Sequence, residues 1–157
     1  MHSQYRKIKY NSLEISYKLQ YKNRKNKENK KILHHKEIMI KDLKIPYEFE
    51  KIVIIKTGWF NNWAEDEYFT DNFHISKEIA KLLIESNING IAIDSPNVDK
   101  YGKSTIHKLF LKNDIWIVEN LTNLDKLTEN SYKSYFIPLN INTEASFIRA
   151  FVKSNKV

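Results

Sequence analysis

One histidine and one glutamate have the chemistry and the setting for a shared site. His107 lies on a short amphipathic stretch that begins at Ser104, and Glu119 ends the apolar run of residues 115–118. A carboxylate buried at the end of an apolar strand is costly unless it is paired or bound to a cation. The two residues therefore indicate a site. The alternative is that Glu119 points into solvent and that His107 is an ordinary surface histidine.

The segments before this pair predict a strand, a helix and a second strand. Residues 51–56 form a short β-branched run bounded by polar side chains, which is typical of a buried strand. Apolar side chains recur at helical spacing over residues 75–88, with Ser76 as the N-cap. Residues 91–93 form the next strand and place Asp94 at its carboxyl end. This order favours a sheet with a crossover helix.

Both ends of the chain predict further strands. Alternating apolar residues between positions 8 and 21 predict a strand with one buried face. Residues 22–31 contain no apolar side chain and predict an exposed loop. The apolar or alternating runs at residues 135–141 and 147–152 predict two closing strands.

Other candidate residues flank the two central strands. Trp59, Phe60 and Trp63 form an aromatic cluster on an expected loop, where they either stack on a substrate or form a small core beneath the loop. Asp94 and Asp99 could each orient a ligand or cap a turn, and turn capping is the favoured role for Asp99.

Four segments of the chain, taken in order, carry a family resemblance. They are Lys56-Thr57-Gly58-Trp59, the run from Gly90 to Asp99, the run from His107 to Asp125, and the ending at residues 137–150. Together they resemble the cyclase family of metal-dependent hydrolases, whose best-known type is kynurenine formamidase. In that family a histidine and a glutamate twelve residues apart are metal ligands, and here 119 − 107 = 12. The resemblance implies that His107 and Glu119 bind the metal and that Trp59 and Asp94 line the substrate site.

The resemblance also implies a fold and a domain division. It implies an α/β fold, the swivelling β/β/α domain of the cyclase family, incomplete at its N-terminal side. Residues 37–157 are expected to form this domain, and residues 1–36 are a basic segment that does not match, made of a strand and an exposed loop. The family's other ligands come from a His-x-Gly-Thr-His-x-Asp-x-Pro run, and this sequence has no such run. A divalent metal, zinc or manganese, is therefore expected to bind weakly or not at all to the chain alone.

The implied activity is hydrolysis of an amide by metal-activated water. The substrate would be N-formylkynurenine, as in tryptophan catabolism, or a cyclic amide, and no catalytic residue is predicted apart from the ligands. The chain alone is expected to be inactive, so whether it is an enzyme stays open. The alternatives are a truncated, non-catalytic binding or interaction protein, or one half of a site that a second copy or another polypeptide completes.

Composition and charge limit the remaining classes of function. The net charge is +7, but residues 1–36 carry 11 − 2 = +9 and residues 37–157 carry 15 − 17 = −2. The basic run at residues 22–31 has no aromatic side chain and little arginine, so no specific nucleic-acid binding is expected. His34 and His35 would point to opposite faces of a strand, which favours an exposed pair over a metal site. The chain has no cysteine, so disulfides and thiolate chemistry are excluded and thiols do not indicate its compartment. It has no run of about 18 apolar residues, so a cytoplasmic protein without a membrane span is expected.

Overall fold

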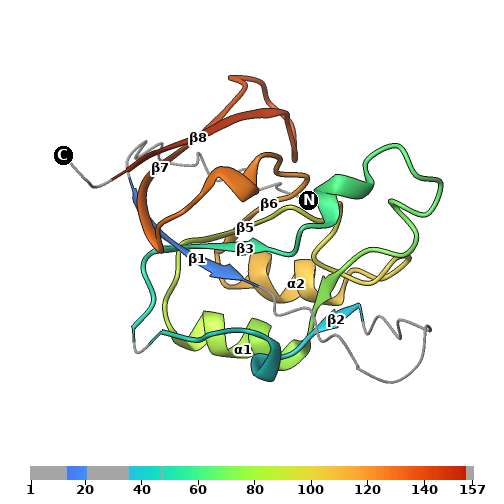
Figure 1. Ribbon diagram of the computed structural model, residues 1–157, viewed down its shortest axis with the longest axis horizontal. Helices are drawn as coiled ribbons and strands as arrows, with labels where there is room; N and C mark the ends of the chain where they lie inside the picture. Colours follow the sequence, from blue (N-terminus) through green and yellow to red (C-terminus); the bar gives the residue numbers. More distant parts are fainter. Residues whose placement is uncertain (1–13, 21–35, 47, 155–157) are drawn as a thin grey trace, which may run out of the picture.

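Parallel strand pairing runs through the centre of the main sheet. The computed structural model describes residues 14–20, 36–46 and 48–154, which form a mixed α/β fold (Figure 1). The six strands of the main sheet are ordered β6-β5-β3-β1-β7-β8. The pairs β1–β3, β3–β5 and β5–β6 are parallel, whereas β1–β7 and β7–β8 are antiparallel. A separate parallel pair joins β2 to β4.

The elements have the following bounds along the chain. They are β1 (Glu14–Gln20), β2 (Glu37–Ile38), η1 (Ile40–Asp42), β3 (Ile52–Lys56), η2 (Trp59–Asn62), β4 (His74–Ile75), α1 (Lys77–Glu85), β5 (Gly90–Ile93), α2 (Thr105–Lys112), β6 (Trp116–Val118), η3 (Leu124–Lys126), β7 (Ser131–Pro138) and β8 (Ile148–Ser154). The strand–helix–strand order β3–α1–β5 is the one predicted from the sequence.

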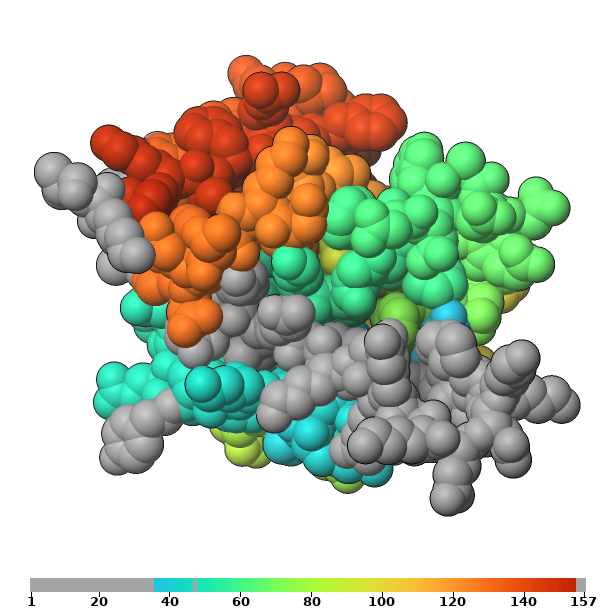
Figure 2. Space-filling model, viewed as in Figure 1, coloured from blue at the N-terminus to red at the C-terminus, as the bar shows by residue number. Residues whose placement is uncertain are grey.

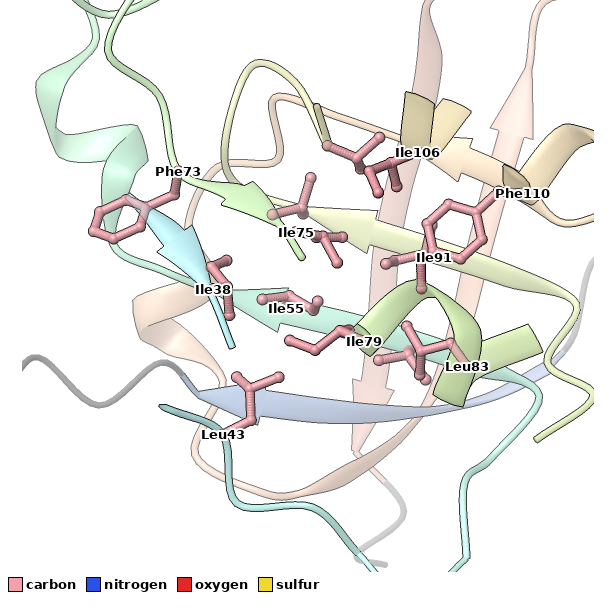
Figure 3. Close-up of a cluster of buried hydrophobic side chains, with 14 of the residues drawn as sticks. Ile38, Leu43, Ile55, Phe73, Ile75, Ile79, Leu83, Ile91, Ile106 and Phe110 are labelled. Atoms are coloured by element: carbon pink, nitrogen blue, oxygen red, sulfur yellow. The ribbon is translucent and has the colours of Figure 1, made fainter. Parts of the chain in front are cut away.

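The central strands are apolar throughout because both faces of the sheet are covered. The first four residues of β3 and all four residues of β5 are buried, as is usual for parallel strands with a packed layer on each side. Both helices lie on one face, and the β7–β8 hairpin covers part of the other (Figure 1). On the helical face, apolar side chains from the strands interlock with Ile79 and Leu83 of α1 and with Ile106 and Phe110 of α2 (Figure 3). On the opposite face, Ile52, Ile54 and Ala92 pack with residues of β7 and β8.

Helix α1 is shorter than the predicted helix at residues 75–88. Ser76 is the N-cap, as expected, because its Oγ accepts a hydrogen bond from the Ile79 N–H at 3.3 Å. Ile75 belongs instead to β4, where it pairs with Ile38 of β2. The helix ends at Glu85 because Asn87 has a positive φ of 53°, a conformation that asparagine tolerates better than most residues and that stops an α-helix.

The closing strands do not have the predicted bounds. Strand β7 begins at Ser131, four residues before the predicted strand at 135–141, because Ser131 and Tyr132 pair with residues of β1. It ends at Pro138, because proline cannot continue donating to a ladder. Strand β8 extends to Ser154, whose partner in β7 is Tyr132.

Strand β1 lies inside the main sheet, between β3 and β7. It forms within the alternating stretch that predicts a strand between positions 8 and 21, and residues before Glu14 lie outside the described ranges. The main sheet therefore contains strands from both sides of the domain boundary expected at residue 36. The loop expected at residues 22–31 and the pair His34 and His35 also lie outside the described ranges. In the part of the chain that the structure describes, no helix has both the length and the apolar character needed to cross a membrane.

Gly90 is required by a close approach rather than by a turn. It pairs with Trp116 of β6, and a Cβ at position 90 would lie 2.1 Å from the indole ring of Trp116. The ring of Trp116 continues into contact with Phe136 of β7, at 5.2 Å between centroids. A glycine at the start of β5 thus allows an aromatic side chain of β6 to lie across the sheet.

Candidate functional site

The candidate residues gather where three parallel strands end. Thr57 follows β3, Asp94 follows β5, and Glu119 follows β6. The carboxyl ends of parallel strands lie at one edge of a sheet, which is where α/β proteins commonly bind ligands. His107, in the first turn of α2, reaches the same edge.

His107 and Glu119 face each other at this edge. The His107 Nε2 lies 3.5 Å from the Glu119 Oε1, and the two side chains are 29% and 22% exposed. This distance is long for a hydrogen bond, which joins N and O at about 2.7–3.2 Å. A tetrahedral ion with bonds of about 2.0–2.2 Å holds neighbouring ligand atoms roughly 3.3–3.6 Å apart. The separation therefore fits two ligands of one ion better than a direct bond.

Asp99 binds the other side of the His107 ring. Its Oδ2 lies 2.9 Å from the His107 Nδ1 and also accepts from the His107 N–H at 2.9 Å, while Oδ1 accepts from the Ile106 N–H at 2.7 Å. Burial alone would raise the pKa of Asp99, but these N–H groups outweigh it and lower the pKa. An ionised carboxylate only accepts hydrogen bonds, so Nδ1 donates to Asp99, and Nε2 is the ring nitrogen that faces Glu119.

This contact also changes how helix α2 begins. The sequence places Ser104 at the start, and Ser104 is the N-cap residue, but its side chain makes no capping hydrogen bond. The carboxylate of Asp99 instead accepts from two of the first N–H groups of the helix. The turn-capping role predicted for Asp99 is therefore observed, together with the contact to His107.

The Glu119 carboxylate is held from behind by the backbone. Its Oε1 accepts a hydrogen bond from the Val98 N–H at 2.7 Å. Burial raises the pKa of Glu119, although the Val98 N–H and the nearby His107 act in the opposite direction. A raised pKa means that the ionised carboxylate lacks sufficient compensation from the protein alone, which is the condition under which a bound cation is most stabilising.

Asp94 is fully buried and holds the turn that follows β3. Its carboxylate accepts from the Thr57 N–H at 2.8 Å, the Thr57 hydroxyl at 2.6 Å and the Gly58 N–H at 2.7 Å. Gly58 has a φ of 85°, which favours glycine at this position. Burial raises the pKa of Asp94, against the opposing effect of its bonds from Thr57 and Gly58. These three hydrogen bonds of the carboxylate serve the turn, and its predicted role in lining a substrate site remains a prediction.

Trp59 lies in the core beneath the loop. Its side chain is 8% exposed, and its indole N–H donates to the carbonyl of Tyr68 at 3.0 Å. The ring meets Phe73 edge-on at 5.6 Å between centroids, and the Lys36 ammonium lies 3.8 Å from its centroid. These contacts agree with one of the two roles considered for the aromatic cluster, a small core beneath the loop. Trp63, in contrast, is 60% exposed.

The side chain of Tyr68 connects this loop to Asn120, the residue that follows Glu119. No motif in the sequence predicts this contact. The Tyr68 hydroxyl donates to the Asn120 Oδ1 at 3.0 Å, across 52 positions of sequence. Asn120 has a φ of 59°, so it turns the chain directly after Glu119. Burial, and then the charge of Asp94, raise the pKa of Tyr68. Figure 2 shows the loop around residue 65 (green) against the segment that follows residue 120 (orange).

Asn72 is a second residue near the site that the sequence did not predict. It is 3% exposed, and its amide nitrogen donates to the carbonyls of Phe73 at 2.9 Å, Asn97 at 3.0 Å and Asp99 at 3.0 Å. The amide thus ties the strand entry at β4 to the turn that carries Asp99. No periodicity or motif marks this residue, because its partners are backbone groups of a distant turn.

The structure brings together two of the four predicted site residues. His107 and Glu119 meet, whereas Asp94 and Trp59 are engaged in the neighbouring turn and core. Within residues 36–46 and 48–154, no group of three or more His, Cys, Asp or Glu side chains is arranged to hold a metal ion. The described part of the chain therefore brings His107 and Glu119 together, and their role as metal ligands stays a prediction.

Comparison with known proteins assigns the chain to a family. The Cyclase family matches residues 15–100, more than half of the 157 residues. An uncharacterised protein of Methanocaldococcus jannaschii is 37% identical over 102 residues, which cover 62% of this chain and 51% of that protein. The chain thus spans about half the length of this relative.

Solved structures agree at the level of the fold. A potential metal-dependent hydrolase with cyclase activity has a TM-score of 0.65 at 20% identity, and a predicted metal-dependent hydrolase from Bacillus stearothermophilus has 0.67 at 19%. Both matches cover 89% of this chain, and they cover 64% and 63% of those chains. An isatin hydrolase bound to the product analogue thioisatinate matches 63% of this chain and 43% of its own, with a TM-score of 0.56 at 20% identity. By its sequence match and its α/β fold, the chain belongs to the Cyclase family, whose structural neighbours here are metal-dependent hydrolases.

Proposed function

We propose that His107 and Glu119 are two ligands of a metal-dependent hydrolase site, which becomes catalytic when further ligands complete it. The observation that carries this proposal is the 3.5 Å separation of Nε2 and Oε1. Each ligand atom is also supported from behind, His107 by Asp99 and Glu119 by the Val98 N–H. Support of this kind is usual for metal-binding histidines, because it fixes the tautomer and the orientation of the ring.

The donor set suits a divalent cation such as zinc or manganese. Imidazole nitrogen and carboxylate oxygen both bind zinc, which usually has three protein ligands in a catalytic site. When bound, such an ion would lower the pKa of a water and polarise an amide carbonyl. The chain's own part is to orient the His107 ring through the bond from Nδ1 to Asp99, to aim the Glu119 carboxylate through the Val98 N–H, and to fix the edge of the site through Asp94 and Thr57.

An amide of small size is the proposed substrate class. Two of the matched structures are described as metal-dependent hydrolases, and the third acts on isatin, whose reactive bond is a cyclic amide. N-formylkynurenine, the amide implied by the resemblance to kynurenine formamidase, belongs to the same class. We retain the swivelling β/β/α domain as the proposed fold type and a second copy or a separate polypeptide as the proposed source of the missing ligands.

Calorimetric titration of the chain with zinc and with manganese tests the ligand assignment. The expected result is weak binding that His107→Ala and Glu119→Gln each abolish. His74→Ala is the matched control, because His74 is also partly buried but its Nδ1 contacts a backbone carbonyl, that of Asn72. Equal metal affinity in the wild type and in both ligand variants would overturn the assignment.

A non-catalytic binding protein is the second candidate function. It is favoured by one observation, that the described residues present two ligands rather than three. A protein of this kind would keep the sheet and the His107–Glu119 pair without turning over an amide. Hydrolysis restored by a complementing polypeptide separates the two candidates.

A further inference from the structure

We propose that Asn72 is a positioning residue for the His107–Glu119 pair and acts on both through the turn at residues 97–99. The importance of Asn72 for catalysis rests on the proposed function, whereas its positioning of the turn does not. The hydrogen bonds of Asn72 join it to Phe73, His74, Asn97 and Asp99 and not to the side chains of the pair, so its effect is transmitted through the backbone.

The turn orients both members of the pair from adjacent residues. The Val98 N–H donates to the Glu119 Oε1 at 2.7 Å. The next residue, Asp99, fixes the ring of His107 through Nδ1 at 2.9 Å and accepts its backbone N–H at 2.9 Å. A shift of this short segment would move both contacts together, so the Nε2–Oε1 separation depends on where the turn lies.

The side-chain amide of Asn72 ties this turn to the backbone at the entry to β4. Its nitrogen donates to the carbonyls of Asn97 and Asp99, on either side of Val98, at 3.0 Å each. The same nitrogen donates to the Phe73 carbonyl, and the Ile75 N–H donates to the Val98 carbonyl at 2.8 Å. The turn is therefore fixed at three consecutive carbonyls, two of them by one amide.

The cost of placing this amide supports a specific role. Asn72 is 3% exposed, and its Oδ1 is buried without a hydrogen-bond partner among the described residues. An unsatisfied buried polar atom is destabilising, and native proteins contain few of them. A residue selected only for core packing would not bring an unpaired oxygen with it. The donor function of the nitrogen, which contacts three carbonyls, explains the choice.

Nitrogen-15 spectra of the histidine rings test the proposal without requiring metal or activity. In the wild type, at a pH at which His107 is neutral, its ring should be a single tautomer with the proton on Nδ1. Asn72→Ala should give a mixture of tautomers and should shift the amide signal of Val98. The His107→Ala spectrum identifies which ring signals belong to this residue.

A matched control separates positioning from general stability. Ser76→Ala also removes a buried hydrogen-bonding side chain, 5% exposed, but one whose hydroxyl caps α1 through the Ile79 N–H. It should lower the melting temperature without moving the His107 or Val98 signals. Unchanged signals in Asn72→Ala, together with lower stability, would mean a purely structural residue and would sink the proposal.

A second variant covers the case in which Asn72→Ala does not fold. Asn72→Ser keeps a shorter donor and should give an intermediate spectrum. If neither variant folds, Asn72 is a folding residue rather than a positioning residue, which also contradicts the proposal. Absence of metal binding by the wild type would end the proposed function but would leave these spectra to decide the role of Asn72.

Discussion

The Nε2 of His107 lies 3.5 Å from the Oε1 of Glu119, and each residue is held by one of two neighbours in a single turn, Asp99 and Val98. The turn follows β5, whereas His107 lies on α2 and Glu119 follows β6. Neither residue therefore belongs to the same element as the turn that holds it. The arrangement makes the pair sensitive to changes that do not touch it.

Loss of the charge on Asp99 should weaken metal binding. Asp99→Asn keeps the size of the side chain but places a donor against either the Ile106 N–H or the His107 contacts. Removal of such a partner of a ligating histidine typically costs about 10–100-fold in metal affinity. Calorimetric titration with zinc should show that loss, or no measurable binding. Asp125→Asn, on the exposed η3 segment, is the control and should bind as the wild type does.

The chain alone, with added zinc or manganese, should not hydrolyse N-formylkynurenine above the background of the metal. The reason is the number of ligands, since a catalytic zinc usually has three protein ligands and the described residues contain no group of three or more His, Cys, Asp or Glu side chains arranged to hold a metal ion. Absorbance at the wavelength of kynurenine follows the reaction. A polypeptide that carries the family's N-terminal histidine motif should restore turnover, and His107→Ala should then remove it. Robust turnover by the isolated chain would contradict this expectation.

Substitution of Gly90 should destabilise the sheet. In Gly90→Ala the new Cβ meets the Trp116 ring at 2.1 Å, so the indole must move and lose its contact with Phe136. Overpacking of this kind typically costs about 1–3 kcal/mol in the free energy of unfolding. Urea denaturation measures it. Gly102→Ala is the control, because the added atom meets nothing within 4 Å and only the positive φ of 72° opposes it.

Removal of the Tyr68 hydroxyl should have a modest effect on stability. Tyr68→Phe keeps the ring contacts with Trp59 and Trp63 and deletes the hydrogen bond to Asn120. The expected loss in the free energy of unfolding is about 0.5–1.5 kcal/mol, the usual net worth of one hydrogen bond. Asn120→Gly is an informative companion, because glycine suits the positive φ but cannot accept the bond. A loss in Tyr68→Phe that persists in the Asn120→Gly background would show that the bond is not its cause.

The buried carboxyl of Asp94 should give stability a measurable pH dependence. Its pKa is raised in the folded state, so the folded protein holds this proton more tightly than the unfolded chain does. The contribution of Asp94 is therefore most favourable below its unfolded pKa, about 4, and is lost as the pH rises through the folded pKa. The free energy of unfolding of the wild type minus that of Asp94→Asn should fall across this window and then level off. A difference that rises with pH would show that the pKa is lowered instead.

The local pattern of the sequence determined the central elements and pointed to the His107–Glu119 pair. Short apolar runs specify β3 and β5, because a strand buried on both faces must be apolar throughout. Ser76 marked the start of α1 through its own side chain, and the spacing of His107 and Glu119 marked the pair through the family resemblance. Each of these signals lies within a few residues of the feature that it predicts.

Only the tertiary structure decided how the pair is held. Asp99 rather than Ser104 caps α2, Val98 holds Glu119, and Asn72 fastens the turn between them. The start of β7 was likewise set by its partner β1, more than a hundred positions earlier in the chain. These contacts join side chains to backbone groups of distant segments. A backbone N–H or carbonyl is the same in every residue except proline, whose N–H is missing, so the sequence carries no mark of which one a side chain will meet.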